Sequence, residues 1–131
     1  MSTHYGWKTL SDMFDYAHQK GLEAGREHKP QSVVFGSPST PLGDDVDLSK
    51  PYDVVDDGVC GFAWVRILPG TCQAARFAKE KWNGRKGHPS GVSVFCHEFN
   101  QSMERKYAYA LAFATVLCDY GFLAVPEARM D

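Results

Sequence analysis

The segment around residue 96 holds several side chains that can do chemistry. It reads Cys-His-Glu-Phe-Asn-Gln-Ser over residues 96–102. A cysteine and a histidine can form a nucleophile–base pair, and His97, Glu98 or His88 could act as acid or base. Cys96 and His97 are neighbours on a predicted strand, so they point to opposite faces and cannot pair with each other. We therefore expect no catalytic residue, and a binding protein rather than an enzyme. The alternative is a small enzyme that acts on a nucleotide or phosphoester.

The polar turn after this segment leads into a helix and is a candidate anion site. Asn100 or Ser102 can cap the helix, and the free amides of its first turn favour an anion. Arg105 and Lys106 follow just inside the helix. The alternative is an ordinary capped helix with solvated charges. The residues we assign to a phosphate or carboxylate ligand are Asn100, Gln101, Ser102, Arg105 and Lys106.

A second candidate ligand site is the basic segment 79–91, which reads KEKWNGRKGHPSG. Basic side chains beside an aromatic ring can hold a nucleic-acid backbone and stack a base. We therefore add Arg85, Lys86 and His88 to the ligand-binding residues. The alternative is a solvated basic loop whose Trp82 anchors the preceding helix.

Neither the cysteines nor the aspartates have the spacing of a metal site. Four cysteines stand at positions 60, 72, 96 and 118 without a Cys-x-x-Cys pair. We expect reduced thiols, because nothing in the sequence indicates export, and no zinc, because structural zinc uses closely spaced ligand pairs. The aspartates at 44, 45 and 47 do not fit a calcium-binding EF-hand. No metal or other cofactor is expected.

Composition is that of one folded domain over residues 1–131. Apolar residues make up 44% of the chain, charged residues 23%, and the net charge is −2. Residues 1–58 carry five Lys/Arg against ten Asp/Glu, whereas residues 59–131 carry nine against six. No apolar run reaches the length of a membrane span, and the first residues lack the pattern of a secretion signal. We expect a cytoplasmic protein that does not enter membranes.

Apolar periodicity in the first half predicts a helix over residues 9–28, with Thr9 as its N-cap. Its Gly21 and Gly25 indicate a kink or the close approach of another backbone. A short strand is expected at 32–37. An acidic loop over 37–58, with three prolines and six aspartates, follows.

The second half, 59–131, predicts a β-α-β-α-β core. Its strands are expected at 60–67, 91–99 and 122–125, the last closed by Pro126. Its helices are expected at 71–82, capped by Thr71, and at 102–120, ending at Gly121. A strand–helix–strand unit favours parallel pairing of the first two strands with a right-handed crossover. The fold class is therefore α/β (α+β): a sheet of three or four strands, helices packed on it, and an extra N-terminal helix.

The helix predicted at 102–120 is apolar nearly all round. Residues 108–118 contain one polar side chain, Thr115. A chain of this size has little interior, so either the N-terminal helix and the sheet cover this helix, or another subunit does. We expect a homo-oligomer, most simply a dimer, with Tyr109 and Phe113 at the contact between subunits.

Three stretches resemble small, mostly uncharacterised proteins of bacteriophage and prophage genomes. They are DDGVCGFAWV, FNQSMERKYAYALAFATVL and GFLAVPEARMD, and the resemblance covers about the last 75 residues. The resemblance supplies no catalytic residue, but it implies a viral setting, in the cytoplasm of a host cell or in a virion. It favours an accessory protein that binds a host or viral macromolecule or an anionic ligand, with nucleic acid or a nucleotide among the partners. A virion structural or assembly protein is the alternative.

Overall fold

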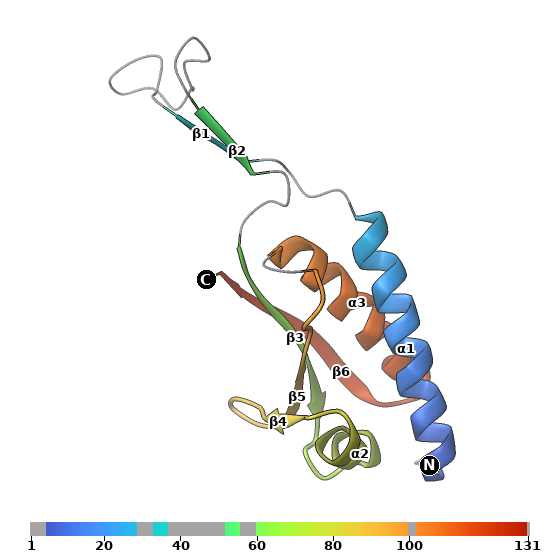
Figure 1. Cartoon of the computed structure of the whole chain (residues 1–131). Coiled ribbons are helices and arrows are strands. Elements are labelled where there is room, and N and C mark those ends of the chain that lie inside the picture. Colours follow the sequence, from blue (N-terminus) through green and yellow to red (C-terminus); the bar gives the residue numbers. More distant parts are fainter. Residues whose placement is uncertain (1–4, 29–32, 37–51, 56–59, 100–101, 131) are drawn as a thin grey trace.

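The computed structural model describes residues 5–28, 33–36, 52–55, 60–99 and 102–130, with 33–36 and 52–55 described by their backbone only. In chain order the elements are α1 (Trp7–Glu27), β1 (Val33–Gly36), β2 (Tyr52–Val55), β3 (Gly61–Leu68), α2 (Gln73–Lys81), β4 (Arg85–Lys86), β5 (Val92–Phe95), α3 (Met103–Asp119) and β6 (Leu123–Met130). The fold is the expected mixture of helix and sheet with an extra N-terminal helix (Figure 1).

Four strands form one antiparallel sheet in the order β4-β5-β3-β6, and β1 and β2 form a separate antiparallel pair. The predicted parallel pairing of β3 with β5 is therefore wrong. The reason is the two-residue strand β4, which lies in the basic segment and was not predicted. Strands β3 and β4, which α2 joins, both run antiparallel to β5 and hence parallel to each other, with β5 between them.

The second strand–helix–strand unit is split in the same way. Strands β5 and β6, which α3 joins, both pair antiparallel with β3, which lies between them. From β3 onwards the elements thus run β-α-β-β-α-β, the order of the split β-α-β, or ferredoxin-like, motif. Each connection crosses over one intervening strand, so every pair of neighbouring strands is antiparallel.

Strand β3 alternates between its two faces as its sequence predicts. Gly61, Ala63, Val65 and Ile67 are buried, and Phe62, Trp64, Arg66 and Leu68 between them are partly exposed. The buried residues are small or β-branched, so α3 can pack closely on them. Figure 1 shows α1 and α3 together on one side of the sheet. The face with Phe62, Trp64 and Arg66 is turned the other way.

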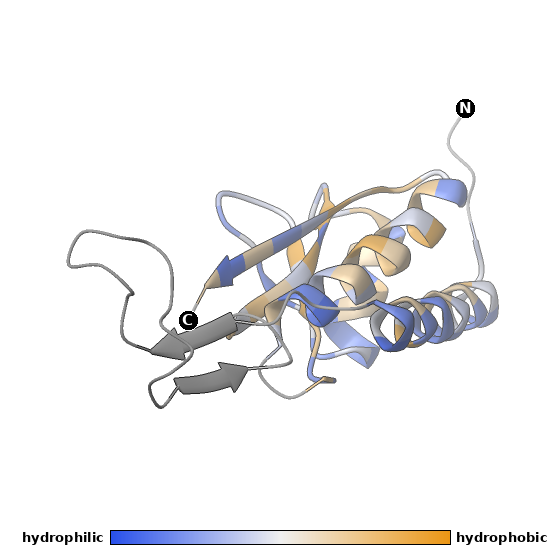
Figure 2. Cartoon of the chain, turned by 90° about the horizontal axis from the view of Figure 1, so that it is seen from above, coloured by the Kyte–Doolittle hydropathy of each residue, from blue (hydrophilic) through white to orange (hydrophobic). Residues whose placement is uncertain are grey.

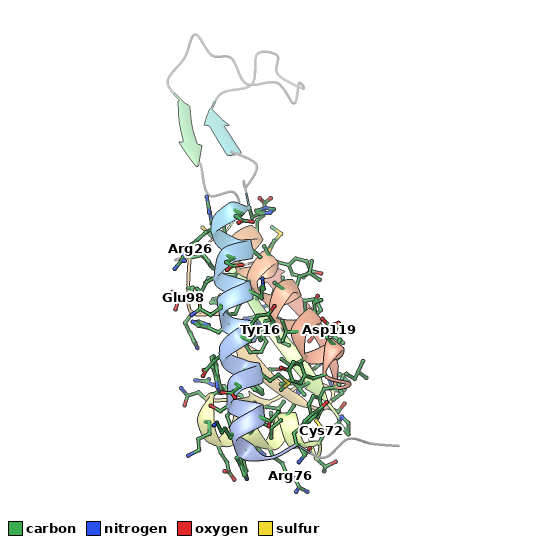
Figure 3. All side chains as sticks on the ribbon, turned by 90° about the vertical axis from the view of Figure 1, so that its right-hand side faces the viewer. Tyr16, Arg26, Cys72, Arg76, Glu98 and Asp119 are labelled. Atoms are coloured by element: carbon green, nitrogen blue, oxygen red, sulfur yellow. The ribbon has the colours of Figure 1, made fainter. Side chains whose placement is uncertain are left out.

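Helix α3 lies between α1 and the sheet, which explains why its sequence is apolar nearly all round. Figures 1 and 3 show α1 and α3 side by side. In Figure 2, α3 is largely orange and α1 largely blue, because α1 keeps a polar outer face. The α3 residues turned outward are exposed, and they include Tyr107, Leu111 and Thr115.

Tyr109 and Phe113 are interior residues of the chain. Tyr109 is 5% exposed and Phe113 fully buried. The Phe113 ring meets Phe14 of α1 at 5.6 Å and Trp82 at 5.9 Å between ring centroids. The expectation that Tyr109 and Phe113 form a contact between subunits is therefore wrong, because α1 already covers them. The homo-oligomer itself stays a prediction.

Several local signals place the helix ends correctly. Ser102 is the N-cap of α3, and its hydroxyl accepts a hydrogen bond from the Arg105 amide at 3.3 Å. Gly121 follows the helix with φ +95°, a conformation in which a side chain is disfavoured. The other two predicted caps are wrong, since α1 begins after Gly6 rather than Thr9, and α2 after Cys72 rather than Thr71.

Three further boundaries differ from the expectation. Strand β5 ends at Phe95, four residues early, and β2 falls within the predicted loop 37–58, of which 37–51 and 56–58 lie outside the described residues. Strand β6 runs through Pro126 to Met130. Because β6 is an edge strand, the missing amide of Pro126 costs the sheet no hydrogen bond. Among the described residues, no helix is long and apolar enough to cross a membrane.

Candidate basic cleft at the edge of the sheet

Of the five residues of the predicted anion turn, the structure describes Ser102, Arg105 and Lys106. Asn100 and Gln101 lie outside the described residues. Ser102 is 2% exposed, and its hydroxyl already caps α3. The Arg105 guanidinium reaches back to α1, where Nη1 donates to the carbonyls of Gly25 at 3.0 Å and Arg26 at 3.3 Å. Ser102 and Arg105 therefore hold α3 in place and join it to the C-terminal end of α1.

Two of the predicted ligand residues, Arg85 and Lys106, do meet in one cleft. Its volume is about 800 Å³. It lies where β4 and β5 meet the α2–β4 connection and the exposed face of β3. The residues that line it are Phe62, Lys79, Asn83, Gly84, Arg85, Phe95, Cys96, His97, Lys106 and Arg129.

The charged residues that line the cleft are all positive. Of its lining residues that the structure describes, four are Lys or Arg and none is Asp or Glu. The chain as a whole carries a net charge of −2, so this concentration of cations is local. Cations that line a cleft with low-dielectric walls raise the local concentration of an anion. The cleft is therefore an anion-binding candidate.

Lys106 is the least exposed of these cations, at 5%. Its ammonium donates to the Gly61 carbonyl at 3.3 Å and lies 5.5 Å from the centre of the Phe62 ring. Arg129 lies over the same ring at 5.6 Å. A lysine ammonium has three donors, and among the described residues the Gly61 carbonyl is its one hydrogen-bond acceptor. The Phe62 ring thus lies close to two cations of the cleft, Lys106 and Arg129. The Lys106 ammonium has further N–H groups that can donate to a ligand.

The two neighbouring cations of β4 point to opposite sides of the sheet. Arg85 pairs with Ser93 and Lys86 with Val92 on β5, so their side chains alternate. Arg85 faces the cleft, whereas Lys86 and His88 are exposed and are not among its lining residues. Of the three residues predicted in the basic segment, the structure brings one to the cleft.

Sequence patterns missed most of the lining. Arg129 was overlooked because the last strand was expected to stop before Pro126, yet β6 continues and places Arg129 opposite Phe62. Phe62 and Phe95 were placed on predicted strands but were not recognised as cleft residues. Lys79 was noted as part of the basic segment. The sequence does contain one signal for the cleft: side chains alternate between the two faces of β3, and this alternation places Phe62 on the face opposite the buried residues.

Two of the groups considered for catalysis lie beside a smaller cavity of about 330 Å³. His97 and Glu98 line it with His18 and Tyr109, and His88 does not. His18 Nδ1 and the Tyr109 hydroxyl are hydrogen-bonded to each other. Burial raises the pKa of Tyr109 far above its ordinary value, so the phenol keeps its proton.

Cys96 is a poor nucleophile in this setting. Burial raises the pKa of its thiol to about 11, and the reactive form of cysteine is the thiolate. All four cysteines are free thiols. Within the described part of the chain, no three His, Cys, Asp or Glu side chains gather as a metal ion would require.

Compared with protein-family models, curated proteins and solved structures, the chain shows no significant match. The chemistry of the cleft is therefore argued from its own residues.

Proposed function

We propose that this protein acts by binding, and that it captures an anionic ligand in the basic cleft. The observation that carries the proposal is the composition of the lining, which has four cations, Lys79, Arg85, Lys106 and Arg129, and no carboxylate among the described residues. A phosphate or carboxylate group meets complementary charge there, and charge-assisted hydrogen bonds to lysine and arginine are the stronger kind.

Two features support a binding role over catalysis. Besides cations and apolar rings, the cleft is lined by His97 and by the buried thiol Cys96, whereas an enzyme needs an activated nucleophile or a matched acid and base. Burial raises the pKa of Cys96, which lines the cleft, and of Tyr109, which lines the smaller cavity, so both stay protonated at neutral pH. The resemblance to small bacteriophage proteins points the same way, towards an accessory protein whose partner is a host or viral macromolecule.

Calorimetric titration with inorganic polyphosphate at low salt tests this proposal. The wild type should bind, and Arg85→Ala should bind more weakly because it removes a cation from the cleft. Lys86→Ala is the matched control, since it removes the same charge from the neighbouring residue on the opposite face. The absence of any binding heat, or equal losses in the two variants, would refute the assignment of the cleft.

A further inference from the structure

An aromatic surface adjoins the basic cleft. Phe95 is partly exposed and lines the cleft. Trp64 lies beside it on β3, with ring centroids 5.1 Å apart and planes tilted by 32°. Both residues lie on the sheet face turned away from α3, because they pair directly across β3 and β5. Two aromatic rings thus lie next to the four cations of the cleft.

The Trp64 ring is held in a fixed orientation. Its indole N–H donates to Glu127 Oε1 at 2.9 Å. The same oxygen lies 3.1 Å from Arg66 Nε, close enough for the charges to attract, although the angle does not suit a hydrogen bond. The carboxylate of Glu127 is therefore neutralised by Arg66, and it is not part of the cleft lining.

We infer that the anionic ligand is a single-stranded nucleic acid, with its phosphates in the basic cleft and a base stacked on Phe95. This inference rests on the proposed function and names its ligand class. Proteins that bind single strands combine a positive groove for the backbone with aromatic rings on which bases stack. Here Lys106 and Arg129, both over Phe62, provide charge, and Phe95 provides a partly exposed ring.

A single strand fits these features better than a duplex. In a duplex the bases stack on each other, so their faces are not available to Phe95. The aromatic rings also lie on the face of a four-stranded sheet, which is wider than the α-helix or two-stranded β-ribbon that the major groove admits. Phosphate binding and stacking do not depend on the identity of the base, so we expect little sequence preference.

The test compares three probes of equal length at low salt by fluorescence anisotropy. They are a labelled oligothymidylate, an abasic strand with the same sugar–phosphate backbone, and a blunt duplex. The wild type should bind the abasic strand through its phosphates, and the oligothymidylate about tenfold or more tighter, because stacking adds affinity for each base. The duplex should bind no better than the abasic strand.

Phe95→Leu keeps the apolar volume at the cleft and removes the ring. It should lower the affinity for oligothymidylate at least about fivefold and leave that for the abasic strand unchanged. Trp7→Leu is the control, since Trp7 is a half-exposed aromatic of α1 that does not line the cleft. Far-UV circular dichroism of both variants checks that they fold.

The outcomes separate this inference from the proposed function. Equal binding of the two single strands, with no effect of Phe95→Leu, would overturn the nucleic-acid assignment and leave the anion site standing. Preference for the duplex would overturn it as well. Failure of all three probes to bind would refute both proposals. A free thymidine nucleotide that competes as well as the strand would show that the ligand is a nucleotide instead.

Discussion

Gly21 of α1 lies against the ring of Tyr109 on α3. A Cβ added at Gly21 would come within 2.5 Å of a ring carbon, and Gly25 lies as closely against Phe99. The sequence had indicated the close approach of a backbone at these glycines, and the structure places aromatic rings there instead. The two glycines allow α1 to cover α3, so they contribute to the burial of the whole apolar helix.

Gly21→Ala should therefore destabilise the protein, although alanine is the better helix former. The helix propensity favours alanine by about 1 kcal/mol, whereas overpacking a tight contact costs about 1–3 kcal/mol. Urea denaturation should show a net loss of about 1 kcal/mol in the free energy of unfolding. Glu23→Ala, at an exposed position of α1, should change it by less than about 0.5 kcal/mol. A Gly21→Ala variant as stable as the wild type would contradict this packing.

Phe113→Glu should unfold the protein, because it places a charge in the core without a partner. The cost of such a change, about 3–5 kcal/mol for the lost ring alone, is comparable to the stability of a small domain. Loss of the circular dichroism signal would check this. A folded monomer after Phe113→Glu would mean that Phe113 lies between subunits after all.

Leu111→Glu is the matched change on the outer side of the same helix, where Leu111 is 50% exposed. It should leave the protein folded. If the predicted dimer forms through the outer face of α3, light scattering should show a dimer for the wild type and the 14.6 kDa monomer for Leu111→Glu. A wild type that scatters as a monomer at micromolar concentration would refute the dimer.

Local sequence patterns predicted the elements whose signals lie within a few residues. The alternation of β3, the Ser102 cap and the Gly121 stop are of this kind. They depend on side-chain direction and backbone preference at neighbouring positions. These signals were enough to place α3 and the central strand.

The cleft depends on pairings that no local pattern contains. Strand β4 is too short to show a period, and without it the crossover from β3 was assigned to β5. Arg129 reaches the cleft because it pairs with Phe62 across 67 residues of sequence. The Arg105 guanidinium, predicted to hold an anion, turns instead towards α1, which is distant in the chain, and the anion turn itself stays a prediction. The sequence could name the basic residues but not which of them would meet.

Arg105→Ala should lower stability and leave ligand binding unchanged. Its guanidinium hydrogen-bonds the last carbonyls of α1, and bonds of this charged kind contribute about 1–3 kcal/mol. Thermal unfolding measures the loss, and polyphosphate titration measures the binding. Weaker binding at unchanged stability would restore Arg105 to the ligand site.

Cys96 makes stability depend on alkaline pH. Burial raises the pKa of its thiol from 9.0 to about 11 in the folded protein. Between these values the unfolded chain loses the proton and the folded chain keeps it, so stability falls as pH rises from 9 towards 11. Urea denaturation at several pH values should show a smaller fall for Cys96→Ala. An identical fall in both proteins would contradict the burial of this thiol.

The salt dependence of single-strand binding tests the central proposal most directly. The affinity for oligothymidylate should fall linearly with salt on a logarithmic plot, because each neutralised phosphate releases counterions. Arg85→Ala should reduce the slope by about 0.7, the value for one phosphate on a single strand, and Lys86→Ala should leave it close to that of the wild type. A slope that is the same in wild type and Arg85→Ala, or that Lys86→Ala lowers equally, would contradict phosphate binding in the cleft.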